Sequence, residues 1–343
     1  MGPVVMPPPI QPGDRVAVLS PSWAAPAYFP EVHEAAMRRL RDDFGVVPVE
    51  YPTTRKSSTP QERAADLNAA FADPDIRAVL ATIGGDDQIT VLRHLDAGAM
   101  TRDPKRFLGY SDNTNLLNWL HFHGVGAVHG GSTQVHLGPV PEAEYLVSLR
   151  AALFGGDVEL TCPTQTRDFG LPWDDPRVLT DVPPGGPAEP WTWLGPPAAV
   201  TGPTWGGNLE ILQWTLAVGR FVRPVEEYAG SVLVLETSEE LPPAEEIFRM
   251  LRNLGERGML GVASALVFGR PPVTDHDHPL EASAAVAARA ERRDAVRRIL
   301  EEYRPGLPAV LDVDFGHTKP QWLLPYGGPL TVDTTTRRIT AHF

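Results

Sequence analysis

The sequence predicts an α/β fold in two parts that are joined by an irregular segment. Short apolar runs alternate with helix-type periodicity over residues 1–160, and strands that alternate with helices form a parallel sheet covered on both faces. A second alternation occupies residues 198–343. The residues between, 161–197, are rich in proline, glycine and tryptophan and show no periodicity. A run of this length without periodicity indicates a domain boundary and a functional loop or arm.

Composition fits a globular protein and excludes several classes. The chain has 343 residues, 42% hydrophobic and 21% charged, which is enough for two domains. A single cysteine, Cys162, excludes an internal disulfide and suits a cytoplasmic location. No apolar run approaches the roughly 20 residues that cross a bilayer, so we expect no membrane partner. A net charge of −13 disfavours binding along a nucleic acid polymer, although a nucleotide-sized ligand remains compatible.

The elements of the first part follow from apolar runs and cap residues. Thr59 is an expected N-cap, because Pro60 follows it at the first helical position. Strands are expected at residues 14–20, 46–50, 78–83, 106–109 and 126–131, and helices at about 31–44, from 59, from 116 and up to about 153.

The second part repeats this alternation and ends in a hairpin. Strands are expected at residues 198–204, 231–236, 265–268, 310–313, 330–333 and 338–343, and helices at 208–218, 244–257 and about 281–303.

Residues 105–115 read as a strand that breaks directly into a helix, with Ser111 at the break. Asp112 and Asn113 supply cap chemistry ahead of the amphipathic helix. Such a turn lifts a hydroxyl off the sheet edge and directs backbone N–H groups at its target. This geometry is typical of a nucleophilic serine. The same residues are also compatible with a serine that only caps the following helix.

Two titratable residues also stand where strands end. Glu236 ends an apolar strand, and His317 follows the strand at residues 310–313. A serine nucleophile needs a base, and the base needs a carboxylate to orient it. Ser111, His317 and Glu236 are the candidates for these roles, although a solvated or ion-paired glutamate and a structural histidine remain alternatives.

Five ordered motifs together resemble the serine peptidase family of LD-carboxypeptidases, and most of all its microcin-C immunity branch. The motifs are Ile83-Gly84-Gly85-Asp86-Asp87, Gly109-Tyr110-Ser111-Asp112, Gly206-Gly207-Asn208-Leu209, Leu235-Glu236 and Gly316-His317-Thr318-Lys319-Pro320. The resemblance runs from Gly13 to Pro325. One departure is Thr237, since many members carry aspartate after the glutamate.

The resemblance implies a serine-type carboxypeptidase with a catalytic triad of Ser111, Glu236 and His317. It implies an oxyanion hole formed by the backbone N–H groups of Gly85 and Asp112. It also implies a flavodoxin-like amino-terminal domain with the serine, a smaller carboxy-terminal α/β domain with the glutamate and histidine, and a site in the cleft between them. We expect a homodimer, and activity that rises with pH near the ordinary histidine pKa of about 6.5.

Two substrate classes fit this family. The immunity branch hydrolyses peptidyl or aminoacyl nucleotide conjugates, and the murein enzymes remove D-alanine from a cell-wall tetrapeptide. Trp173, Trp191 and Trp193 are candidates for stacking on a base, or they pack the arm against the sheet or a second subunit. Asn208 and Arg249 are candidate substrate contacts by position.

Other signals indicate no metal and no cofactor. Asp275-His276-Asp277-His278 has the letters of a metal site, but a polar loop is the favoured interpretation. His121, His123 and His129 are interpreted as structural, and neither a Walker loop nor a G-x-G-x-x-G motif occurs. A hypothesis of another class is a non-catalytic protein that binds nucleotide conjugates.

Overall fold

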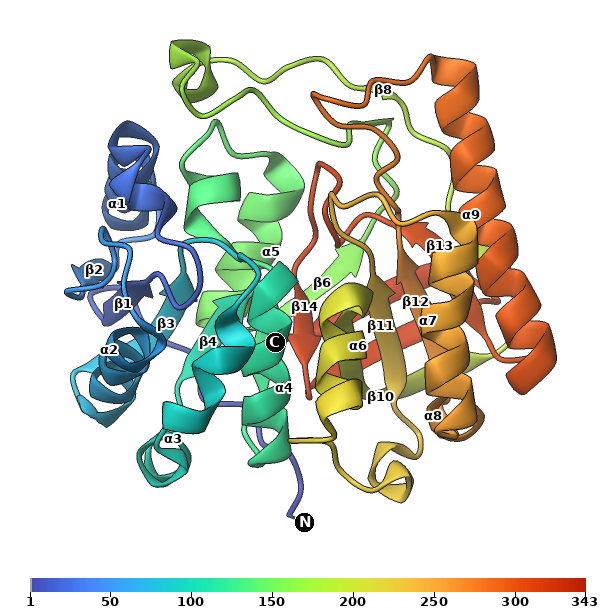
Figure 1. Cartoon of the computed structure of the whole chain (residues 1–343), viewed down its shortest axis with the longest axis horizontal. Helices are drawn as coiled ribbons and strands as arrows, with labels where there is room; N and C mark the ends of the chain where they lie inside the picture. The colour runs from blue at the N-terminus through green and yellow to red at the C-terminus, as the bar shows by residue number, and fades with distance from the viewer. Residues whose placement is uncertain (1) are drawn as a thin grey trace.

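A computed structural model describes residues 2–343, and it confirms the predicted α/β fold. Two large sheets lie next to each other, with helices packed on their faces (Figure 1). The first sheet has the order β14-β5-β4-β3-β1-β2 and is parallel except for β14. Its strands are β1 (Arg15–Leu19), β2 (Val47–Glu50), β3 (Ile76–Ala81), β4 (Arg106–Gly109), β5 (Ala127–His129) and β14 (Leu324–Tyr326).

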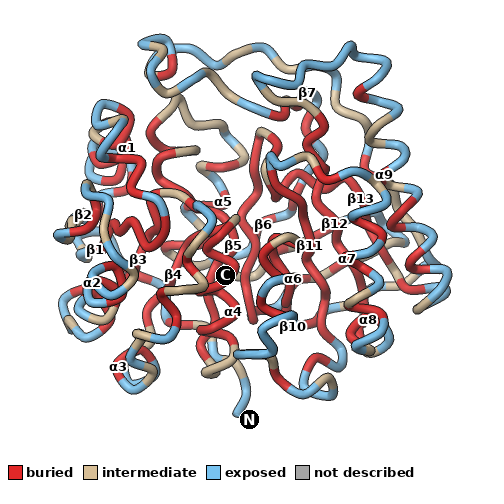
Figure 2. The backbone as a smooth tube through the Cα atoms, viewed as in Figure 1, coloured by how far each residue is buried: buried red, intermediate tan, exposed pale blue. Residues whose placement is uncertain are grey.

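The second sheet has the order β6-β16-β15-β10-β11-β12-β13-β9, with a parallel centre from β10 to β13 and antiparallel strands on both sides. Its strands are β6 (Asp157–Leu160), β9 (Thr192–Leu194), β10 (Ala199–Asn208), β11 (Val232–Glu236), β12 (Ala265–Gly269), β13 (Ala309–Val313), β15 (Pro329–Asp333) and β16 (Arg338–His342). The central strands are buried, as Figure 2 shows by their red colour.

The helices begin and end at residues with suitable cap chemistry. Thr59 caps its helix as expected, because its hydroxyl accepts from the Glu62 N–H while the Glu62 carboxylate accepts from the Thr59 N–H. None of the helices within residues 2–343 has the length and apolar character of a bilayer span. The α-helices are α1 (Pro30–Asp42), α2 (Pro60–Ala72), α3 (Ala97–Arg102), α4 (Thr114–Phe122), α5 (Ala143–Phe154), α6 (Leu209–Val218), α7 (Ala244–Glu256), α8 (Met259–Val262) and α9 (Ala282–Tyr303).

The two halves of the chain share one hydrophobic core. Helix α4 follows the Ser111 turn and packs beside α6, which follows β10 (Figure 1). Leu116 and Leu120 of α4 belong to the same buried cluster as Leu212 of α6 and Trp205 of β10. Burying a side chain of this size contributes about 1.5–3 kcal/mol, so this shared cluster fixes the first sheet against the second.

Each sheet contains a strand from the other part of the chain, so a division at residues 160 and 198 does not separate the two sheets. Strand β6 pairs with β16 of the second sheet. Strand β14, near the carboxyl terminus, completes the edge of the first sheet by pairing Leu324 with His129. These strands have three or four residues, which is too short for a sequence pattern to specify the partner.

The segment 161–197 runs over the same side of both sheets, at the top of Figure 1. It contains β7 (Gln165–Thr166), β8 (Gly186–Pro187) and β9 as its strands. The Trp191 indole is buried and donates to the Asp314 carboxylate at 2.8 Å. That carboxylate also accepts from Arg270 at 2.7 Å, and both members of this ion pair are fully buried. Trp191 therefore anchors the segment through a buried polar network.

We expect Trp191→Phe to lower the free energy of unfolding by about 1–3 kcal/mol, because it removes a donor from a buried carboxylate. Trp193→Phe is the matched control, since Trp193 is half-buried against the same hydrophobic cluster as Trp191, but no described residue accepts a hydrogen bond from its indole N–H. Chemical denaturation of both variants measures the difference. Equal destabilisation by the two substitutions would contradict the role given to the Trp191 N–H.

Candidate active site

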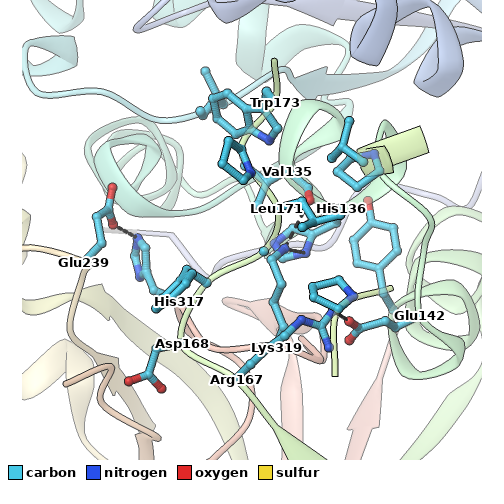
Figure 3. Close-up of a pocket in the computed structure, with 18 of the residues that line it drawn as sticks. Val135, His136, Glu142, Arg167, Asp168, Leu171, Trp173, Glu239, His317 and Lys319 are labelled. Carbon is cyan, nitrogen blue, oxygen red and sulfur yellow. Dashed lines mark hydrogen bonds and ion pairs between the residues drawn. The ribbon is translucent and has the colours of Figure 1, made fainter. Parts of the chain in front are cut away.

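A cavity of about 490 Å³ lies where the carboxyl ends of strands from both sheets face each other. Ser111 and the glycine loop after β3 border it from the first sheet, and His317, which follows β13, borders it from the second. Part of the segment 161–197 covers the cavity, and Figure 3 shows residues of that segment beside His317. The cavity therefore joins residues that are far apart in the sequence.

Ser111 occupies a strained turn. Strand β4 ends at Gly109, a short 3-10 turn spans Ser111–Asn113, and α4 begins at once. The φ angle of Ser111 is 62°, in the left-handed region that side chains rarely adopt. Such strain costs about 1–3 kcal/mol and persists only where the surroundings impose it. The strand-to-helix break expected from the sequence is present, with the serine at its apex.

The glycine loop lies directly against this serine. A Cβ atom on Gly84 would lie 2.8 Å from the Ser111 Cβ and 3.2 Å from the backbone nitrogen of Asp112, so only glycine fits there. A Cβ on Gly85 would collide with the Ser22 hydroxyl. Within residues 2–343 neither the Gly85 nor the Asp112 N–H donates to another residue. Both N–H groups therefore remain available to a ligand.

A network of buried side chains fixes the glycine loop against the serine turn. The Asp112 carboxylate accepts from the Ser22 hydroxyl at 2.5 Å and from the Gln88 N–H at 2.9 Å. The Gln88 amide donates to Asn113 at 2.8 Å, and the Asn113 amide donates to the Ile83 carbonyl at 3.0 Å. Burial raises the pKa of Asp112, although the hydrogen bonds from Ser22 and Gln88 oppose the shift.

Glu236 and His317 form a buried pair. The Glu236 Oε2 lies 2.6 Å from the His317 Nδ1, and the Glu236 side chain is fully buried. Gly316 makes this approach possible, because a Cβ there would lie 2.8 Å from the Glu236 Oε2. The second carboxylate oxygen of Glu236 lies 3.8 Å from the His129 Nε2, too far for a hydrogen bond.

The second nitrogen of His317 also faces a carboxylate. The exposed Glu239 places its Oε2 3.2 Å from the His317 Nε2, as Figure 3 shows. Burial disfavours the charged imidazole, but Glu236 and Glu239 together outweigh burial and raise the pKa of His317 to about 9. The pKa of His317 is therefore raised above the value near 6.5 expected from an unperturbed imidazole.

The other predicted contact residues take different places. Trp173 borders the cavity, and its ring stacks on Trp23 with a centroid distance of 6.1 Å. Trp191 and Trp193 do not border it, because one is tied to Asp314 and the other lies in β9. Arg249 is exposed on α7 and is also absent from the cavity wall, so the cavity gives its expected substrate contact no support and the contact stays a prediction.

Asn208 and Thr237 lie below the cavity, near Glu236. Asn208 is the N-cap of α6, where its side-chain oxygen accepts from Ile211 at 2.9 Å, and it stands opposite Glu236 in the sheet register. Asn208 is buried and does not border the cavity, and its side-chain nitrogen has no partner among the described residues, so the substrate contact expected of it stays a prediction. The Thr237 hydroxyl is buried without a hydrogen-bond partner among the described residues.

Several cavity residues were not singled out from the sequence as site residues. The advance signals were that Trp23 follows the first strand and that Tyr110 and Lys319 stand within the motifs at residues 109–112 and 316–320. The other such residues, which no distinctive sequence pattern marks, are His136, Arg167 and Glu239.

The histidine- and aspartate-rich loop at residues 275–278 organises itself as a turn. The Asp275 carboxylate accepts from the backbone N–H groups of Asp277 and His278 at 2.8 and 2.5 Å. Across residues 2–343 no cluster of three or more histidine, cysteine or acidic side chains has the arrangement of a metal site.

Fold and site together define a class: a two-domain α/β protein with the residue set of a hydrolytic enzyme. A serine on a strained turn, a glycine loop against it, and an imidazole held by a buried carboxylate meet at one cavity.

Comparison with known proteins identifies the family. The amino-terminal domain of LD-carboxypeptidases matches residues 16–130, and their carboxy-terminal domain matches residues 201–332. The chain therefore belongs to the LD-carboxypeptidase family of peptidases.

Individual relatives cover nearly the whole chain. A putative carboxypeptidase of Vibrio cholerae is 26% identical over 94% of this chain and 92% of its own length. The microcin C7 self-immunity protein MccF of Escherichia coli is 27% identical over 83% of this chain and 79% of its own. A solved structure of MccF in complex with aspartyl sulfamoyl adenosine superposes with a TM-score of 0.83 at 22% identity, covering 99% and 98% of the two chains.

We expect kcat/KM for a chromogenic p-nitrophenyl ester to increase with pH. The midpoint of this increase, the rising limb of the pH profile, should lie well above pH 6.5. A base accepts a proton only when neutral, and the two carboxylates hold the His317 pKa at about 9. Glu239→Gln should move this limb down by a few tenths of a unit, since an exposed ion pair contributes about 0.2–1 kcal/mol.

Glu245→Gln is the control for this pH profile, because Glu245 is exposed and paired with Arg298 on the outside of the molecule. A limb that stays in place in Glu239→Gln, or that moves equally in both variants, would refute the contribution of Glu239.

Proposed function

We propose that this chain is a serine hydrolase that cleaves the amide bond of peptidyl or aminoacyl nucleotide conjugates through Ser111, His317 and Glu236. The observation that carries the proposal is the strained Ser111 turn, which shares one cavity with the Glu236–His317 pair and with an aromatic wall. The Ser111 turn and the Glu236–His317 pair support hydrolysis by a serine nucleophile. The aromatic wall, formed by Trp23 and Trp173, supports a substrate that carries a nucleobase.

The reaction begins with attack of the Ser111 hydroxyl on the scissile carbonyl carbon while His317 takes the hydroxyl proton on Nε2. Glu236 holds the Nδ1–H and stabilises the imidazolium. The Gly85 and Asp112 N–H groups stabilise the oxyanion, and each such donor contributes about 3 kcal/mol to the transition state. His317 then protonates the leaving nitrogen, and water hydrolyses the acyl-enzyme. The Glu239 carboxylate must move away from the His317 Nε2 before the first step, because that nitrogen has to accept the proton of Ser111.

The aromatic wall supports a nucleobase as part of the substrate. Trp23 and Trp173 stack on each other, and Phe29 meets the Trp173 ring edge-on at 5.3 Å. Trp23 is 40% exposed, so part of its ring is open to a ligand. A base stacked on such a ring contributes about 1–3 kcal/mol. The MccF structure in complex with aspartyl sulfamoyl adenosine is consistent with this substrate class.

A second candidate is removal of the terminal D-alanine from a murein tetrapeptide, which is a reaction of the carboxypeptidase type that the family's name states. Both candidates use the same nucleophile and differ in what the cavity binds beyond the scissile bond. The comparison of substrates below separates them.

We expect Ser111→Ala to reduce hydrolysis to less than about one-thousandth of wild type, because loss of a nucleophile costs more than that. The far-UV circular dichroism should be unchanged, since the side chain loses only one oxygen. A fluorophosphonate probe should label the wild type and not the variant. A wild type that resists the probe would instead favour a protein that binds conjugates without cleaving them.

We expect Trp173→Ala to lower kcat/KM for an aminoacyl sulfamoyl adenosine by a factor of about 5 to 150, the equivalent of one lost stacking contact. Turnover of a murein tetrapeptide should hardly change, because that substrate has no base. Trp193→Ala is the matched control, since Trp193 lies outside the cavity. Parallel losses on both substrates, or a wild type that cleaves only the murein peptide, would favour the second candidate.

A further inference from the structure

We propose that Lys319, together with Arg167 and His136, forms an anion subsite in the cavity, and that this subsite selects substrates with a carboxylate or phosphate next to the scissile bond. The inference rests on the proposed function, because it names a recognition element of the same cavity. Figure 3 shows Lys319 directed toward His136, with Arg167 beside it and Trp173 at the other end of the view.

Lys319 has few partners for a charged group. It borders the cavity and is otherwise enclosed by protein. Its Nζ donates to the Val135 carbonyl at 3.1 Å and lies 3.4 Å from the His136 Nδ1. None of the described carboxylates pairs with it, although an ammonium carries three donors. An enclosed charge without a counter-charge is costly unless a ligand supplies one.

The neighbouring charges leave an excess of positive charge on this wall. Arg167 pairs with Glu142, so that this carboxylate is already occupied. Asp168 pairs with Arg289 at 2.6 Å. The Arg167 Nε is buried without an acceptor among the described residues. Two cations therefore face one carboxylate, and a bound anion would balance the set.

The pKa shifts of Lys319 and His136 agree with an excess of positive charge at this wall. Burial, and to a smaller extent the charge of Arg167, together lower the pKa of Lys319 to about 7. Burial also keeps the pKa of His136 well below its usual range, with Lys319 adding to the shift, so that His136 is neutral. An anion near Nζ would reverse the effect on Lys319, because an opposite charge favours the ammonium.

The subsite is linked to the nucleophile through Tyr110. Because Lys319 only donates, the His136 Nδ1 accepts from it, and the His136 Nε2–H then faces the Tyr110 hydroxyl at 3.2 Å. Tyr110 directly precedes Ser111, and its ring lies 4.9 Å from the His317 ring. Lys319 therefore stands a short way along the cavity wall from the catalytic groups.

This placement matches the chemistry of both substrate classes. One extended residue spans roughly 3.5 Å, so the terminal carboxylate of a peptide cleaved at its last bond lies within a residue of the serine. In an aminoacyl nucleotide the phosphate directly follows the scissile amide. Either anion would meet Lys319 on the wall of the cavity that Ser111 also borders, and a neutral group there would leave Lys319 without a counter-charge.

The test measures binding by calorimetry in the Ser111→Ala background, so that no turnover is required. The four probes are N-acetyl-lysyl-D-alanine, its carboxamide, AMP and adenosine. Lys319→Met keeps the length of the side chain and removes its charge. We expect it to weaken at least one anionic probe by about 10- to 100-fold, the range for a charge-assisted hydrogen bond, and to leave the neutral probes unchanged.

Lys56→Met is the control, because Lys56 is exposed and paired with Glu62 on the surface. A loss confined to the dipeptide acid identifies a carboxylate subsite, one confined to AMP a phosphate subsite, and a loss of both a general anion subsite. Equal losses for neutral and anionic probes, no loss at all, or no binding of either anionic probe would overturn the proposal. Failure of the proposed function appears separately, as a wild type that a fluorophosphonate does not label.

The melting temperature of Lys319→Met distinguishes recognition from packing. A subsite lysine is uncompensated in the free protein, so its replacement should leave the melting temperature unchanged or raise it. A clear decrease, with losses for all four probes, would mean that Lys319 is a structural group instead.

Discussion

The buried contact between Glu236 and His317 is the interaction on which the rest of the site depends. A carboxylate without solvent requires a charged or polar partner at close range, and His317 supplies it at 2.6 Å. Gly316 and Gly269 leave room for this contact, because a side chain at either position would collide with Glu236. The imidazole is thereby fixed in orientation, and its other nitrogen is directed toward the cavity and Glu239.

The serine side of the cavity is built by a different means. Ser111 keeps its left-handed backbone because Asp112, Gln88 and Asn113 tie its turn to the glycine loop. Stored strain is tolerated at such a position when many contacts over-determine it. The shared core of α4 and α6 then holds this rigid turn against the second sheet. Ser111 and His317 are consequently presented by separate sheets that behave as one packed unit.

Charge is distributed unevenly around the cavity. Two carboxylates flank His317, whereas Arg167 pairs with Glu142 and none of the described carboxylates pairs with Lys319. The aromatic pair Trp23 and Trp173 adds an uncharged surface to the same space. A ligand that carries a flat ring and an anionic group would match this pattern better than a purely apolar one, since each part would meet its own kind of surface.

The sequence by itself determined most of the elements and the family, whereas tertiary structure decided where the short strands β6, β9 and β14 pair and which side chains meet. Apolar runs, the Thr59 cap and the break at Ser111 are local features, and local sequence encodes them through periodicity and backbone preference. The motifs at residues 83–87 and 316–320 carried the resemblance for the same reason. Trp191 and Trp173 look alike in the sequence, yet one is anchored to Asp314 and the other borders the cavity. The places of Lys319 and Glu239 in the cavity depend on contacts with residues far away in the chain. Spacing along a sequence does not specify contacts between separate loops.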